Sequence, residues 1–204
     1  MDYAPGPIAE AQALVASTKA TNVTFQTADI FSLPFPDASF DVTHAHQVLQ
    51  HISEPVRALK ELKRVTKPGG IVACRETDVK TFIWYPELPA LSRWSYITEN
   101  VARRNDCEPN AGRRLKAWAR EAGFKGEGIK CSAGTWCFSS HDERAYWGGS
   151  MAKRLEESHL GVSAVEEGIA TKEEVQETVK ALRDWIDNED GWFGLLHGQM
   201  IARV

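Results

Sequence analysis

Apolar and polar positions in the first third of the chain follow a pattern that predicts an α/β arrangement. Two β-branched and aromatic runs, Val23–Thr27 and Phe40–His46, are separated by a turn-rich segment. Apolar residues then recur at helical spacing over Glu54–Val65, and two glycines precede a third strand-like run, Ile71–Glu76. Strand, strand, helix and strand with turns between them are typical of an α/β sheet with parallel crossovers.

The rest of the chain also carries helical and strand-like patterns. A helix is expected from Pro7 onward, with an apolar face formed by Ile8, Ala11, Leu14 and Val15. Further helices are expected over Glu87–Arg104, Ala111–Ala122, His141–His159 and from Thr171 onward. Further strands are expected over Gly126–Phe138 and Gly191–Val204.

Two helix starts carry capping signals. Ser53 precedes the helix at Glu54–Val65 and is expected to cap it. Thr171 stands three residues before Glu174, which is the spacing of a capping box.

Composition and charge narrow the classes of function. The 204 residues are enough for a buried core in a single domain over 1–204. The net charge of −4 gives no reason to expect a nucleic acid partner. No apolar run approaches the roughly 18 residues that a membrane helix needs. The start MDYAPGPIAEAQ has no basic segment followed by an apolar one, so a cytoplasmic location is expected.

Cysteine and histidine residues do not form a metal-binding pattern. The four cysteines contain no C-x-x-C pair and are expected to be reduced thiols. His44 and His46 share one strand face with Phe40 and Val42, so we expect them to be buried histidines with satisfied hydrogen bonds. His51 is expected on a helix surface, and no metal site is predicted.

A joint motif gives a resemblance to a known family. The run ADIFSLPFPDASFD and, further along, RVTKPGG resemble class I S-adenosylmethionine-dependent methyltransferases of the ubiquinone/menaquinone-biosynthesis type. The resemblance is clear from Met1 to about Glu76 and looser beyond. It implies a Rossmann-like sheet in which Val23–Thr27, Phe40–His46 and Ile71–Glu76 are the third, fourth and fifth strands of the family.

The resemblance also implies the cofactor, S-adenosylmethionine, and residues that would bind it. Asp2 stands where the family places the acid that accepts from the ribose hydroxyls, and Tyr3 follows where a side chain lines the adenine. Asp29 matches the acid that accepts from the adenine amino group, and the Ile30 amide would meet a ring nitrogen. Read without the resemblance, Asp29 is a residue that caps a turn.

Two more residues complete the implied site. His46 and Gln47 stand at the end of the fourth strand and would face the methionine part of the cofactor and the methyl acceptor. The sequence nominates no catalytic base. The aromatic segment Phe82–Trp94, with Trp136 and Trp147, is either a lid over the acceptor or part of the core.

One family feature is missing from the 204 residues. No glycine-rich loop of the D-x-G-x-G-x-G sort is present. If Asp2 ends the second strand, the first strand, the first helix and the second strand are missing. The sequence therefore predicts an N-terminally truncated sheet with helical additions at 79–122 and 141–190. Four strands are expected to be contiguous, and the third strand either lacks its neighbours or pairs directly with the fourth.

The functional expectation follows from the resemblance. It is S-adenosylmethionine-dependent methyl transfer to a small-molecule acceptor, impaired in this chain because the glycine-rich loop is missing. The alternative is a non-catalytic methyltransferase-like remnant that binds a partner. The missing loop favours the remnant, whereas retention of Asp2 and Asp29 favours the enzyme. The oligomeric state is not predicted.

Overall fold

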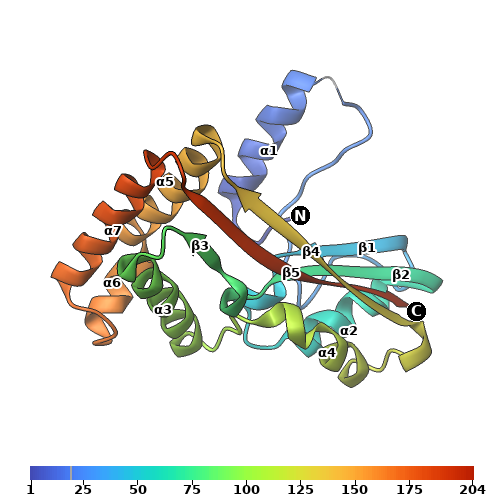
Figure 1. The fold of residues 1–204 in the computed structure, drawn as a ribbon. Coiled ribbons are helices and arrows are strands. Elements are labelled where there is room, and N and C mark those ends of the chain that lie inside the picture. Colours follow the sequence, from blue (N-terminus) through green and yellow to red (C-terminus); the bar gives the residue numbers. More distant parts are fainter. Residues whose placement is uncertain (19) are drawn as a thin grey trace.

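Five strands and seven α-helices make up the computed structural model, which describes residues 1–18 and 20–204 (Figure 1). The strands are β1 (Phe40–His46), β2 (Thr66–Thr77), β3 (Ile83–Tyr85), β4 (Ile129–Phe138) and β5 (Trp192–Arg203). The helices are α1 (Pro5–Thr18), α2 (Pro55–Val65), α3 (Pro89–Arg104), α4 (Leu115–Glu121), α5 (His141–Glu157), α6 (His159–Glu166) and α7 (Lys172–Ile186). Short 3-10 helices are η1 (Leu49–His51), η2 (Val79–Thr81), η3 (Ala111–Arg114) and η4 (Gly126–Gly128).

The sheet is mixed, and β5 is its central strand. β1 runs parallel to β2, and β2 runs antiparallel to β5. β4 pairs with the other side of β5, from Ile129 to Phe138, and the short β3 pairs with the start of β5. The order β1-β2-β5-β4 is the contiguous set of four strands that the sequence predicts. Among the described residues, the outer edge of β1 pairs with no other strand.

The strand expected at Val23–Thr27 does not form. The segment has a single bridge, parallel, between Asp2 and Thr27, in which the Ala28 amide donates to the Asp2 carbonyl at 2.9 Å. A β-branched run becomes a strand when a neighbour supplies hydrogen bonds along its length. Asp2 supplies one such contact, and the alternative pairing of Val23–Thr27 with β1 is also not formed.

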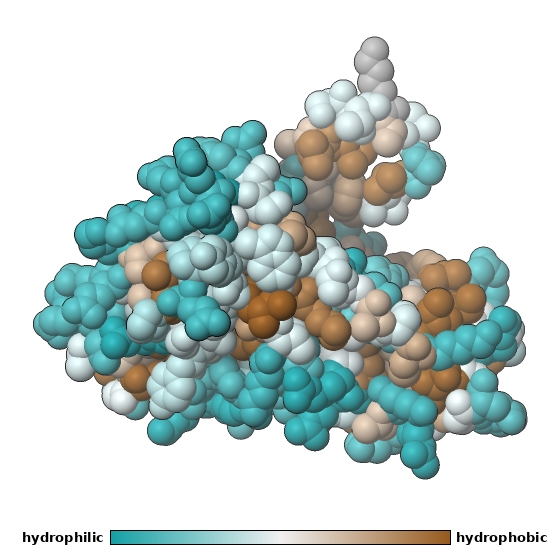
Figure 2. All heavy atoms as spheres, viewed as in Figure 1, coloured by the Kyte–Doolittle hydropathy of each residue, from teal (hydrophilic) through white to brown (hydrophobic). Residues whose placement is uncertain are grey.

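The first helix forms where the sequence predicts it, but its apolar face is not buried. None of the residues of α1 is buried, and Leu14 is 67% exposed. Figure 1 shows α1 standing away from the rest of the molecule, and Figure 2 shows apolar atoms at its surface. Helical spacing therefore predicts the conformation of this segment correctly and its packing wrongly.

One buried cluster lies between the sheet and the helices α2 and α4. Leu59 and Leu62 of α2 and Leu115 of α4 face Val72 and Met200 of the sheet, and all are buried. Their spacing on α2 is the helical spacing seen in the sequence. The helix begins at Pro55 after Glu54, and no side chain caps it, so the cap expected at Ser53 is wrong.

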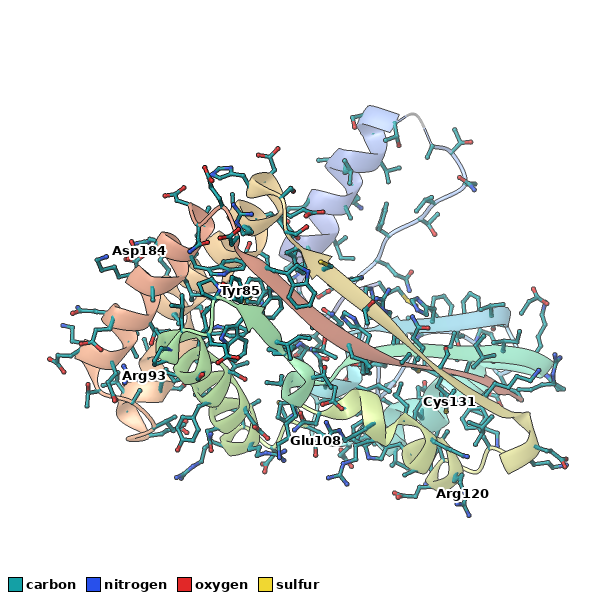
Figure 3. The ribbon with its side chains drawn as sticks, viewed as in Figure 1. Tyr85, Arg93, Glu108, Arg120, Cys131 and Asp184 are labelled. Atoms are coloured by element: carbon teal, nitrogen blue, oxygen red, sulfur yellow. The ribbon has the colours of Figure 1, made fainter. Side chains whose placement is uncertain are left out.

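A second buried cluster lies among α3, α5, α7 and the start of β5. Trp94, Trp147, Trp185 and Phe193 meet there, and the rings of Trp147 and Phe193 are 3.6 Å apart between centroids. Trp94 and Trp147 are 2% and 7% exposed, so the interpretation as core is confirmed for them and the lid interpretation is wrong. Figure 3 shows Arg93 and Asp184 on the helices of this group, well away from Cys131 on β4.

The boundary between α5 and α6 differs from the sequence expectation of one helix over His141–His159. Ser158 has an extended backbone, and its hydroxyl accepts from the Leu160 amide at 3.2 Å, which starts α6. Gly161 lies in that helix where an added Cβ would be 1.8 Å from the Leu155 carbonyl oxygen. The turn brings α6 back against α5 and α7, and helical spacing alone does not reveal it.

Replacing Thr171 by alanine is expected to lower the free energy of unfolding by about 1 kcal/mol. The Thr171 hydroxyl accepts from the Glu174 amide at 3.1 Å, and the Glu174 carboxylate accepts from the Thr171 amide at 2.9 Å, so the predicted capping box is confirmed. Urea denaturation followed by circular dichroism measures the change. Thr171→Ser keeps the hydroxyl and is the control; equal loss in both variants would contradict the capping explanation.

Candidate functional site

The carboxyl ends of β1 and β2 meet around a buried carboxylate. After β1 the chain turns at Gln47, which has a φ of 54°, and η1 follows directly. The Glu76 carboxylate at the end of β2 accepts from the amides of Val48, Leu49 and Gln50 at 3.2, 3.1 and 3.2 Å. Burial raises the pKa of Glu76 to about 7, although the three amides favour its charged form. The carboxylate therefore holds the loop that follows β1 against β2.

His197 of β5 lies beside this turn and is fully buried. The side-chain amide nitrogen of Gln47 is 2.8 Å from His197 Nε2 and 3.0 Å from the Thr77 hydroxyl. Arg75 Nη2 is 3.2 Å from His197 Nδ1, so each ring nitrogen of His197 faces a nitrogen of a neighbouring side chain. Burial and the nearby Arg75 charge lower the pKa of His197 to about 4. The ring is therefore neutral near pH 7.

The predicted residues Asp2, Tyr3, Asp29 and Ile30 come together at the N-terminal part of the chain. The Asp2–Thr27 bridge places Asp2 beside the segment that leads to Asp29. Asp29 Oδ1 accepts from the Phe31 amide at 2.9 Å, which is the turn-capping geometry. Ile30 packs against the cluster below the sheet, whereas Tyr3 is 82% exposed. Asp29 thus caps a turn at one carboxylate oxygen.

Asp2 has the same arrangement as Asp29. Its Oδ1 accepts from the Ala4 amide at 2.9 Å. Within the described residues, neither carboxylate has a hydrogen bond or ion pair at Oδ2, and both residues are exposed. In each acid, one carboxylate oxygen is therefore oriented by a turn, and the other is accessible to solvent.

His46 lies on the face of the sheet opposite α2 and α4, on an exposed part of that face. Its ring packs edge-on against Trp136, with 5.9 Å between centroids, and both His44 and His46 are exposed. The expectation that these two histidines are buried is wrong. The reason is that the helices α2 and α4 lie on the opposite face, which carries Ala45 and Cys74.

Four residues of this region were not predicted as site residues: Arg75, Glu76, His197 and Gln199. Period-two alternation in the last strand places His197 and Gln199 on one face, and this signal is present in the sequence. Gln47 and His197 are separated by 150 positions, so the contact follows from the register of β2 on β5.

The comparisons with known proteins agree with this architecture. A family model described as a methyltransferase domain matches residues 1–74. An uncharacterized methyltransferase of Schizosaccharomyces pombe is 36% identical over 188 residues, which are 91% of this chain and 66% of that protein. The chain belongs to the class I S-adenosylmethionine-dependent methyltransferase family. It spans just under two thirds of the length of that relative.

Two further members of the family match smaller or more distant parts. The ubiquinone/menaquinone biosynthesis C-methyltransferase of Bdellovibrio bacteriovorus is 41% identical over 61 residues, 30% of this chain and 26% of that protein. The solved structure of phosphoethanolamine N-methyltransferase 2 of Haemonchus contortus has a TM-score of 0.53 and 17% identity. It covers 99% of this chain and 42% of that one, and at this identity it shows a shared methyltransferase fold.

Over residues 1–18 and 20–204, no helix combines the length and the apolar character that crossing a bilayer requires.

Proposed function

We propose that this chain carries the adenosine-binding and acceptor-facing parts of an S-adenosylmethionine-dependent methyltransferase that acts on a small molecule. The observation that carries the proposal is that the Asp2–Thr27 bridge brings Asp2 close to Asp29. In each acid, a hydrogen bond from a backbone amide to Oδ1 fixes the orientation of the carboxylate. The related Haemonchus contortus enzyme was solved with S-adenosylhomocysteine, which supports the same cofactor here. The family match favours this enzyme over the partner-binding remnant.

The residues present fit the adenosine part of the cofactor. Asp2 would accept from the ribose hydroxyls and Asp29 from the adenine amino group, through the oxygens left by their turns. Tyr3 is exposed beside Asp2 and would cover the adenine ring, and the Ile30 amide would donate to a ring nitrogen. For the methionine part, the described residues offer His46 and Gln47 but no glycine-rich loop.

The chemistry of methyl transfer requires little more than positioning. The cofactor supplies an electrophilic methyl group on a sulfonium, and in-line transfer depends on the alignment of the acceptor. Gln47 is held by Thr77 and His197, so its backbone turn after β1 is fixed. His46, at the end of β1, faces the exposed side of the sheet, where an acceptor has access.

Adenosine is expected to bind this chain about as tightly as S-adenosylhomocysteine, because the 204 residues lack the loop that would hold the amino acid part. Inosine, which has no 6-amino group, is expected to bind about tenfold more weakly than adenosine. The reason is that inosine cannot donate the hydrogen bond that the adenine amino group would make to the charged carboxylate of Asp29. Asp29→Asn should remove most of the preference for adenosine. Isothermal titration calorimetry measures the affinities of adenosine, inosine and S-adenosylhomocysteine.

The matched control is Asp37→Asn, which removes an exposed carboxylate elsewhere in the same half of the chain. Equal affinity for adenosine and inosine in the wild-type chain would contradict the role of Asp29. Micromolar binding of S-adenosylmethionine would contradict the expectation that the cofactor site is impaired.

A further inference from the structure

The side of the sheet opposite α2 and α4, which we call the open face, is formed by alternate residues of four paired strands. It includes two buried residues, Thr77 and His197, beside exposed ones. Its members are Val42, His44 and His46 of β1, Ile71, Ala73, Arg75 and Thr77 of β2, His197, Gln199 and Ile201 of β5, and Lys130, Ser132, Gly134 and Trp136 of β4. Val42 and Ile201 are 56% and 50% exposed. No member of this set is acidic, whereas arginine, lysine and histidine are all present. The open face therefore favours a negatively charged ligand.

Arg75 is the central cation of the open face. The register of the strands places it in one row with His46, Gln199 and Ser132. Its guanidinium packs over the Trp136 ring at 4.9 Å and contacts His197 through Nη2. Its Nε is buried without a hydrogen-bond partner, and none of the ion pairs formed by the described residues includes Arg75. The charge of this half-buried side chain is thus not neutralised within the described protein.

A glycine makes room for a second donor beside Arg75. A Cβ added at Gly134 would lie 2.7 Å from Gln199 Nε2 and 3.7 Å from Arg75 Nη2. The Ser132 hydroxyl is 3.0 Å from Gln199 Oε1, which orients the Gln199 amide so that its nitrogen points toward Gly134. Glycine inside a strand is unfavourable unless a close approach requires it. Here the absence of a side chain lets two donor groups meet.

We propose that Arg75 and Gln199 bind the carboxylate of the methyl acceptor, which is an aromatic acid whose ring packs against Trp136. Arg75 offers Nη1 and the remaining hydrogen of Nη2, and Gln199 offers its amide nitrogen, so the carboxylate has donors for both oxygens. Trp136 is 37% exposed and presents an aromatic surface beside the guanidinium. This inference rests on the proposed function and names the substrate class for it.

Benzoate tests this site without any cofactor. The titration follows the indole ¹H–¹⁵N signal of Trp136, assigned with Trp136→Phe, in the full 204-residue chain. Benzoate is expected to shift this signal saturably, and its neutral analogue benzamide and the ringless acetate are expected to bind at least about tenfold more weakly. Equal binding of benzoate and benzamide would overturn the proposal.

Two variants separate the site from general charge attraction. Arg75→Gln is expected to weaken benzoate binding about tenfold. Lys130→Gln removes the same charge from the same face and is expected to leave the affinity unchanged; an equal effect in both variants would overturn the assignment to Arg75. Gly134→Ala is expected to weaken binding by displacing Gln199, while circular dichroism shows native secondary structure. Wild-type affinity in folded Gly134→Ala would refute the part assigned to Gln199.

A competition distinguishes the acceptor from the cofactor, whose amino acid part also carries a carboxylate. S-Adenosylhomocysteine is expected to leave the benzoate affinity unchanged, and displacement of benzoate would show that Arg75 serves the cofactor, which overturns the proposal. If adenosine and inosine bind equally while benzoate still binds as expected, the result contradicts the proposed function and leaves the acceptor site standing.

Discussion

Gly198→Ala is expected to destabilise the fold by more than about 3 kcal/mol. A Cβ at Gly198 would lie 2.1 Å from the Gly112 carbonyl oxygen and 2.6 Å from its Cα. The obstacle is backbone, in the 3-10 helix η3 that crosses β5, and a rotamer change cannot relieve it. The backbone of Glu76 also lies against this crossing. A Cβ added at Gly112 would be 2.7 Å from the Glu76 carbonyl oxygen.

Urea denaturation measured by circular dichroism tests this expectation. The control is Gly149→Ala in α5, where an added Cβ meets nothing within 4 Å. That variant is expected to gain about 1 kcal/mol, since alanine is the better helix former. If Gly198→Ala unfolds at the same urea concentration as the wild type, η3 and β5 do not approach as described.

The contribution of Glu76 to stability is expected to fall by on the order of 3 kcal/mol as the pH rises from about 4.5 to about 7. Burial raises the pKa of this carboxyl from 4.5 to about 7 in the folded protein. A group whose pKa is higher in the folded state binds its proton more tightly there. Its contribution is therefore fully present below pH 4.5 and is lost as the pH passes through 7.

The measurement is the free energy of unfolding at pH 4.5, 6 and 8 for the wild type and Glu76→Gln. Glutamine does not titrate, so the difference between the two proteins should change with pH by the stated amount. Its amide nitrogen would face one of the amides of η1, so Glu76→Gln is also expected to be the less stable protein at pH 4.5. Glu121→Gln, on an exposed position of α4, is expected to show no such trend. A constant difference between wild type and Glu76→Gln would refute the raised pKa.

Local patterns in the sequence predict local structure well in this protein. The apolar spacing over Glu54–Val65 and the capping box at Thr171 depend on residues within a few positions of one another, and both are found in the structure. The two strands expected at Gly126–Phe138 and Gly191–Val204 are also present as β4 and β5. These two runs form strands because each has a hydrogen-bonding partner within the chain, β4 and β5 pairing with each other.

Features that depend on distant parts of the chain were predicted less well. The strand at Val23–Thr27 does not form, because a strand needs a partner along its length. The face of α1 remains exposed because nothing in the described residues packs on it. Arg75, Gln199 and Gly134 meet through the register of three strands, and no short motif marks such a row.

The predicted site residues also differ in how well the sequence indicates their positions. Asp2 and Asp29 come from a family motif and lie together in the structure, and their binding of adenosine remains a prediction. His46 was placed with the cofactor, but its ring lies on the open face against Trp136. The resemblance therefore predicts a site at one end of the sheet and does not specify which face each side chain occupies.

The last strand belongs to both buried clusters at once. Phe193 and Leu195 at its start contribute to the aromatic cluster of the helices, whereas Met200 and Ala202 near its end contribute to the cluster above α2 and α4. If either cluster unpacks, side chains of β5 lose their contacts, and the backbone hydrogen bonds that join β5 to β2 and β4 lose support. The helices and the sheet are thus linked mechanically through β5, which makes them a single cooperative folding unit in spite of their separate interiors.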